Sequence, residues 1–67
     1  MPYVNIRVTR ECVTKEQKAQ LIAGVTELLH LVLAKPVGST FVIIDEVDTD
    51  NWGTGGEQVT DKRKRGA

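Results

Sequence analysis

The chain begins Met1-Pro2 and continues YVNIRV, an alternating run that predicts a strand. If Met1 is removed, the Pro2 nitrogen becomes a free secondary amine, held rigid by its ring at the start of an ordered element. Such an amine is a compact base that can take up a proton and return it. The alternative is structural, because a proline can also begin an edge strand, where its missing N–H costs little.

A catalytic base works best when its pKa lies near the working pH. An ordinary α-amine has a pKa of about 8, and the secondary amine of proline is more basic. We expect apolar surroundings and nearby cations to lower the pKa of the Pro2 amine, because both disfavour its charged form. Pro2 would then remove a proton as a neutral amine and return it as a cation.

The other reactive side chains are few, and they argue against several classes of site. Cys12 is the only cysteine, so no intrachain disulfide can form, and no base stands beside it in sequence. His30, the only histidine, falls off the apolar face of the predicted helix, and no Cys/His cluster indicates a zinc site. The formal net charge is zero. The basic run at 62–65 lacks the interleaved aromatic residues of a nucleic-acid surface, which favours a solubilising tail.

Three elements must position Pro2. Residues 3–9 alternate as a half-buried strand does, and Thr14 opens a capping box, T-K-E-Q, ahead of a helix with apolar residues at helical spacing. Lys35 is a suitable cation for the last turn, and Pro36 marks the stop. Residues 40–47, TFVIIDEV, form the second strand. This order predicts a right-handed βαβ unit with two parallel strands, an α/β (α+β) fold.

A glycine-rich segment follows the second strand and marks turns. Residues 57–60 are then expected to form a short strand in a C-terminal β-hairpin. Residues 61–67, DKRKRGA, predict a basic, frayed and disordered tail. The predicted organisation is therefore one βαβ domain over residues 1–60 and a tail over residues 61–67.

A chain of 67 residues buries only about 60% of the surface that its unfolded form exposes, so small folds need additional support. The second strand has apolar residues at both its odd and its even positions, which predicts burial on both faces of the strand. One helix can cover only one of these faces. Gly24 and Leu31 mark a second packing stripe on the helix. Self-association is therefore the expected source of burial. No membrane span or secretory signal is apparent, and with a lone thiol this predicts a cytoplasmic protein.

The order and spacing of several segments together resemble the 4-oxalocrotonate tautomerase family. The matching segments are the Met-Pro start, TKEQKAQLIAGVTELL, Pro36, FVIIDEV and NWGTGGE. The resemblance implies a cofactor-independent keto–enol tautomerase without a metal, in which Met1 is removed and Pro2 is the general acid–base. It also implies that two βαβ units join into a four-stranded sheet with helices on one face, and that three such dimers form a homohexamer.

The same resemblance implies where the substrate binds. Family members place one arginine just after the first strand, near Arg10, and a second early in the second strand, where this chain has Phe41. Arginine suits both a carboxylate and a developing enolate because its donor fork is planar. The loss of the second arginine favours a smaller or more apolar enol, or a monoacid. The residues assigned to the substrate site are Arg10, Arg7, Phe41, Trp52, Thr9 and Ser39.

Alternatives stand beside these assignments. Arg7 also fits a solvated or ion-pairing residue, and Trp52 also fits a plug in a subunit interface. A hydratase or dehalogenase relative would use protonated Pro2 to assist the addition of water to an unsaturated acid. A non-catalytic oligomeric protein would bind small acids without turnover, and a nucleic-acid accessory protein would act through residues 62–65.

Overall fold

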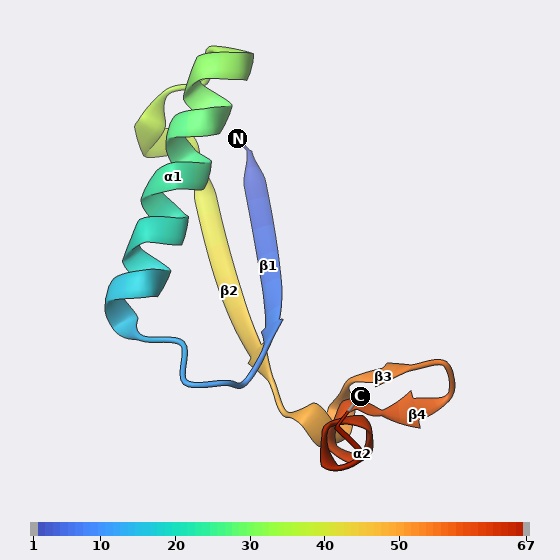
Figure 1. The fold of residues 1–67 in the computed structure, drawn as a ribbon. Coiled ribbons are helices and arrows are strands. Elements are labelled where there is room, and N and C mark those ends of the chain that lie inside the picture. The colour runs from blue at the N-terminus through green and yellow to red at the C-terminus, as the bar shows by residue number, and fades with distance from the viewer. Residues whose placement is uncertain (1, 67) are drawn as a thin grey trace.

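The computed structural model describes residues 2–66, and Figure 1 shows their arrangement. Strand β1 (Tyr3–Thr9) leads into helix α1 (Lys15–Leu33), and a short 3-10 turn precedes strand β2 (Phe41–Val47). Strands β3 (Gly53–Thr54) and β4 (Glu57–Gln58) form a hairpin, and helix α2 (Val59–Lys64) follows it. The prediction of a βαβ unit with a C-terminal hairpin is confirmed.

The central feature is a parallel ladder between β1 and β2, running from the pair Tyr3–Phe41 to the pair Thr9–Val47. Alternation along both strands separates the two faces of this sheet. One face packs its aliphatic residues under α1. The other face carries Tyr3, Ile43 and Phe41, which are 62%, 48% and 53% exposed. Nothing in residues 2–66 covers this second face, as expected of a single copy, so burial of β2 on both faces would require a neighbouring copy.

Helix α1 starts where the sequence predicts. The Thr14 hydroxyl accepts from the Gln17 N–H at 3.0 Å, and the Gln17 side chain accepts from the Thr14 N–H at 2.9 Å, so the capping box is complete. The helix ends at Leu33, since Ala34 adopts the left-handed conformation with φ 56°. Lys35 therefore lies beyond the last turn, which corrects the prediction that it is the terminal cation; His30 occupies that turn.

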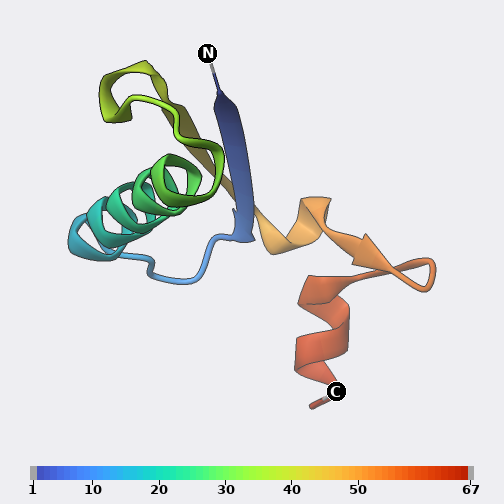
Figure 2. The ribbon, with the colours of Figure 1, turned by 90° about the horizontal axis from the view of Figure 1, so that it is seen from above.

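The hairpin and α2 form an arm, residues 53–66, that extends past the carboxyl ends of β1 and β2 on the side away from α1 (Figures 1 and 2). The predicted third strand at 57–60 is shorter, because β4 ends at Gln58 and Val59 already begins α2. The expectation of a disordered tail from residue 61 is also corrected, since residues 61–64 are helical; Ala67 lies outside the described residues.

The molecule is extended and thinly packed. Its radius of gyration is 15.3 Å, whereas a compact chain of this length has about 11 Å. None of residues 2–66 is fully buried, and Leu31 on the outer side of α1 is 71% exposed. A single copy therefore leaves much of its apolar surface in water. Within residues 2–66, no helix is long and apolar enough to cross a membrane.

Replacing the N-cap by Thr14→Ala is expected to lower the free energy of unfolding by about 1 kcal/mol, because the Gln17 N–H loses its acceptor. Urea denaturation at one fixed protein concentration measures the change, since association shifts apparent stability. Thr14→Ser keeps the hydroxyl and serves as the control. An equal loss in the serine and alanine variants would contradict a stabilising role for the cap.

Candidate active site

Pro2, Ser39 and Phe41 lie together at the amino ends of the strands, and we call them the amino-end cluster. The Phe41 N–H donates to the Pro2 carbonyl oxygen at 3.0 Å, which ties Pro2 to the start of the ladder. Pro2 is half-buried, and Ser39 sits in the turn before β2, where its hydroxyl donates to the Pro36 carbonyl at 2.9 Å. Thr40 precedes Phe41, and its buried Oγ1 has no hydrogen-bond partner among residues 2–66.

Arg7, Thr9, Arg10 and Trp52 lie at the carboxyl ends of the strands, and we call them the carboxyl-end cluster. Both arginines line an open cavity of about 580 Å³. The remaining lining residues of this cavity are Asp45, Glu46, Val47, Asp48 and Asn51.

The two arginines differ in their surroundings. The Nε of Arg7 lies 3.5 Å from Asp45 Oδ2 and donates to Asn5 Oδ1 at 3.2 Å. Arg10 is exposed, and its backbone N–H donates to the Val47 carbonyl at 2.8 Å. Its side chain makes no ion pair or hydrogen bond within the described part of the chain. Arg10 is thus the cation in this cavity whose guanidinium is free to meet an anion.

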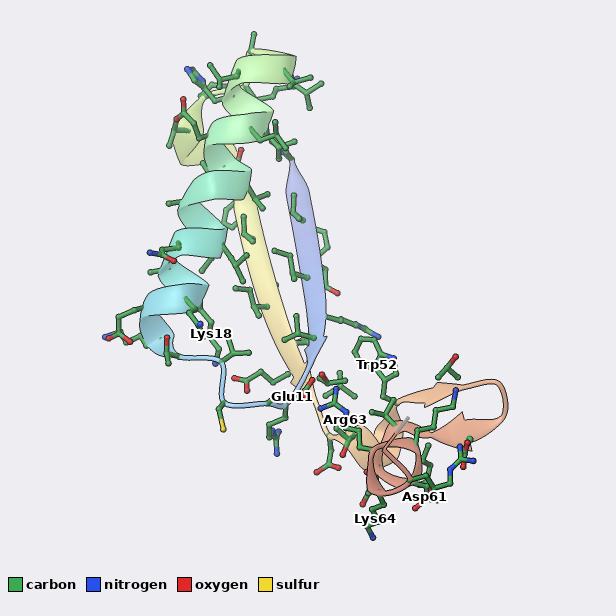
Figure 3. All side chains as sticks on the ribbon, viewed as in Figure 1. Glu11, Lys18, Trp52, Asp61, Arg63 and Lys64 are labelled. Carbon is green, nitrogen blue, oxygen red and sulfur yellow. The ribbon has the colours of Figure 1, made fainter. Side chains whose placement is uncertain are left out.

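Trp52 joins the strands to the arm (Figure 3). It lines a second cavity of about 300 Å³ together with Arg7, Val47 and Asn51. The Thr9 hydroxyl donates to the Glu11 carboxylate, which also pairs with Arg63 of α2. Thr9 is therefore engaged in holding the arm against the loop after β1.

The structure does not bring the two clusters together. Strand β1 spans seven residues, so at about 3.3 Å per residue its ends lie roughly 20 Å apart. Pro2 and Arg10 flank those opposite ends. Within one copy, no small molecule can touch both residues.

The sequence alone does not reveal the ion-pair partners of Asp45 and Glu46. Asp45 lies opposite Arg7 in the ladder, and Glu46 pairs with Lys18 of α1. Asp48, which lines the cavity, was not assigned to the site. The strand register would have identified Arg7 as the partner of Asp45, because residues opposite each other in a parallel ladder project on the same face. Among residues 2–66, no group of three His, Cys, Asp or Glu side chains is arranged to hold a metal ion.

Comparison with known proteins places these features in context. A family model described as tautomerase enzyme matches residues 2–62. The probable tautomerase K2 of Dickeya dadantii (strain 3937) is 63% identical over 65 residues, which cover 97% of each chain.

Two solved structures are also similar. The crystal structure of DmpI from Helicobacter pylori has a TM-score of 0.88 and 49% identity, over 94% of this chain and 97% of that one. A heterohexamer 4-oxalocrotonate tautomerase from Chloroflexus aurantiacus J-10-fl has a TM-score of 0.83 and 25% identity, over 90% and 95% of the two chains.

Proposed function

We propose that this chain, which belongs to the tautomerase family, interconverts the enol and keto forms of a small 2-oxo acid or a related carbonyl compound. Family membership supports tautomerase activity and hence an isomerase. The observation that supports Pro2 as the general acid–base is its place at the ordered start of β1, tied down by the Phe41 N–H at 3.0 Å. Met1, whose removal this role requires, lies outside the described residues.

The proposed reaction moves one proton and needs no cofactor. The neutral Pro2 amine takes the proton from the enol hydroxyl while the carbon–oxygen double bond forms. The electrons of the former carbon–carbon double bond then take up a proton at the adjacent carbon from the Pro2 ammonium, so the amine ends neutral.

Arg10 is the proposed anchor for the substrate carboxylate and the developing oxyanion, because its planar fork is free in the carboxyl-end cavity. Since one copy holds Pro2 and Arg10 at opposite ends of β1, we infer that the two residues come from different copies. An antiparallel neighbour beside β1 would bring the carboxyl end of its own β1 to Pro2. This arrangement is the predicted dimer with a four-stranded sheet.

Self-association also accounts for the packing of a single copy. The open face of the sheet and the projecting arm each need a neighbour, since none of residues 2–66 is fully buried. We propose a homohexamer, a trimer of dimers, and the heterohexameric neighbour from Chloroflexus aurantiacus supports this assembly size.

Pro2→Ala is expected to lower kcat/KM for ketonisation of phenylenolpyruvate by about 10² to 10⁴-fold, the usual contribution of a positioned acid–base. Ultraviolet absorbance follows the reaction, and intact mass establishes whether Met1 is absent. Size-exclusion chromatography with light scattering serves as the control that the variant still assembles. Activity in the assembled variant close to that of the wild type would contradict the proposed base. Absence of activity in the assembled, processed wild type would favour water addition or simple binding instead.

Mixing two inactive variants tests whether the site is shared between copies. Pro2→Ala and Arg10→Ala, unfolded together and refolded as mixed assemblies, are expected to recover about a quarter of the wild-type sites, because random pairing restores an intact Pro2–Arg10 pair at that frequency. Each variant refolded alone is the control. A mixture no more active than the separate variants would contradict a site built from two copies.

A further inference from the structure

We propose that the substrate carries a single carboxylate on an otherwise apolar body, and that Asp45 enforces this preference by neutralising Arg7. The inference rests on the proposed function, because it concerns the substrate of the same site. Asp45 acts here as a specificity-determining residue, through the arginine that it neutralises.

Arg7 is contacted through its Nε by two polar side chains on the open face of the sheet. Asp45 lies directly opposite it in the ladder, 3.5 Å from its Nε, and Arg7 Nε also donates to Asn5 Oδ1 at 3.2 Å. Asn5 also contacts Asp45, because its Nδ2 donates to Asp45 Oδ2 at 2.9 Å and to the Ile43 carbonyl at 3.1 Å. A substrate carboxylate that approached Arg7 would lie close to Asp45, whose negative charge already offsets that of the guanidinium.

One guanidinium of this cavity then remains without a carboxylate partner. Arg10 has no side-chain partner within residues 2–66, and its fork matches one carboxylate in a bidentate pair. The lining of the same cavity carries three carboxylates, on Asp45, Glu46 and Asp48, against the two arginines. A second carboxylate on the substrate would therefore meet negative charge rather than a free cation.

The surfaces beyond Arg10 suit an apolar group. Trp52 and Val47 line the adjoining cavity. The proposed neighbouring copy would bring the amino end of its own ladder to Arg10, where Tyr3, Phe41 and Ile43 are about half exposed or more. A carboxylate pressed against such side chains loses water without gaining a partner, which is costly. A planar apolar substituent gains contact with the same surface.

Two substrates that differ only in a distal carboxylate test the preference. We expect kcat/KM for phenylenolpyruvate to exceed that for 4-carboxyphenylenolpyruvate by at least about tenfold, which corresponds to about 1.4 kcal/mol. Calorimetric titration with cinnamate and 4-carboxycinnamate gives the same comparison as dissociation constants, without requiring turnover. Equal or better use of the dicarboxylate in either comparison would overturn the inference.

Asp45→Asn tests the assigned cause, because it removes the charge that offsets that of Arg7 while keeping the size of the side chain. The variant is expected to bring the ratio of the two binding constants severalfold closer to one by improving the dicarboxylate. Asp48→Asn is the matched control, since it removes a charge from the same cavity lining and leaves the Arg7–Asp45 pair intact. Asp45→Asn combined with Arg7→Gln is expected to restore the wild-type ratio.

The outcomes separate the two proposals. If neither enol is ketonised but cinnamate binds at least about tenfold more tightly than its dicarboxylate counterpart, the tautomerase proposal fails and the selectivity stands. If both enols react equally well, the tautomerase proposal stands and the selectivity is refuted. A similar shift in Asp45→Asn and Asp48→Asn would also refute the role assigned to the Arg7–Asp45 pair, because charge alone would then explain it.

Discussion

The parallel ladder between β1 and β2 determines where each candidate site residue lies. Because both strands run the same way, Pro2 and Phe41 meet at one end, while Arg10 and Val47 meet at the other. A connection through α1 is what makes parallel pairing possible, since parallel strands require a crossover. The ladder that organises the fold therefore also separates the proposed base, Pro2, from the proposed anion anchor, Arg10.

Association with a neighbouring copy would account both for the distance between Pro2 and Arg10 and for the thin packing of one copy. The sheet has one face under α1 and one open face. The arm extends past the carboxyl ends of the strands, on the side away from α1 (Figure 2). Small chains without disulfides or metals usually gain the missing burial by association. On our account, the neighbour that covers the open face also completes the site, so assembly and activity depend on the same surfaces. The Arg7–Asp45 pair lies on that face.

The fold was largely predictable from local signals, because strand alternation and a capping box act over a few residues. Thr14 and Gln17 form the predicted cap, and β1 has the predicted bounds. The end of α1 and the helical state of residues 61–64 were missed, since Ala34 adopts an uncommon left-handed conformation and α2 is held by contacts such as Arg63–Glu11. The site was less predictable. Sequence identifies Pro2 and Arg10, whereas the distance between them and the pairing of Arg7 with Asp45 require the strand register.

The central claim is that Pro2 carries a free amine tuned to act as a base near neutral pH. Nitrogen NMR of protein labelled with ¹⁵N-proline tests it directly, because the chain has two prolines and Pro36, inside the chain, serves as a non-titrating reference. The account predicts an amine resonance from Pro2 that titrates with a pKa below the value of about 8 of an ordinary α-amine. Two amide-like resonances that do not move with pH, or a Pro2 amine still protonated well above pH 8, would contradict it.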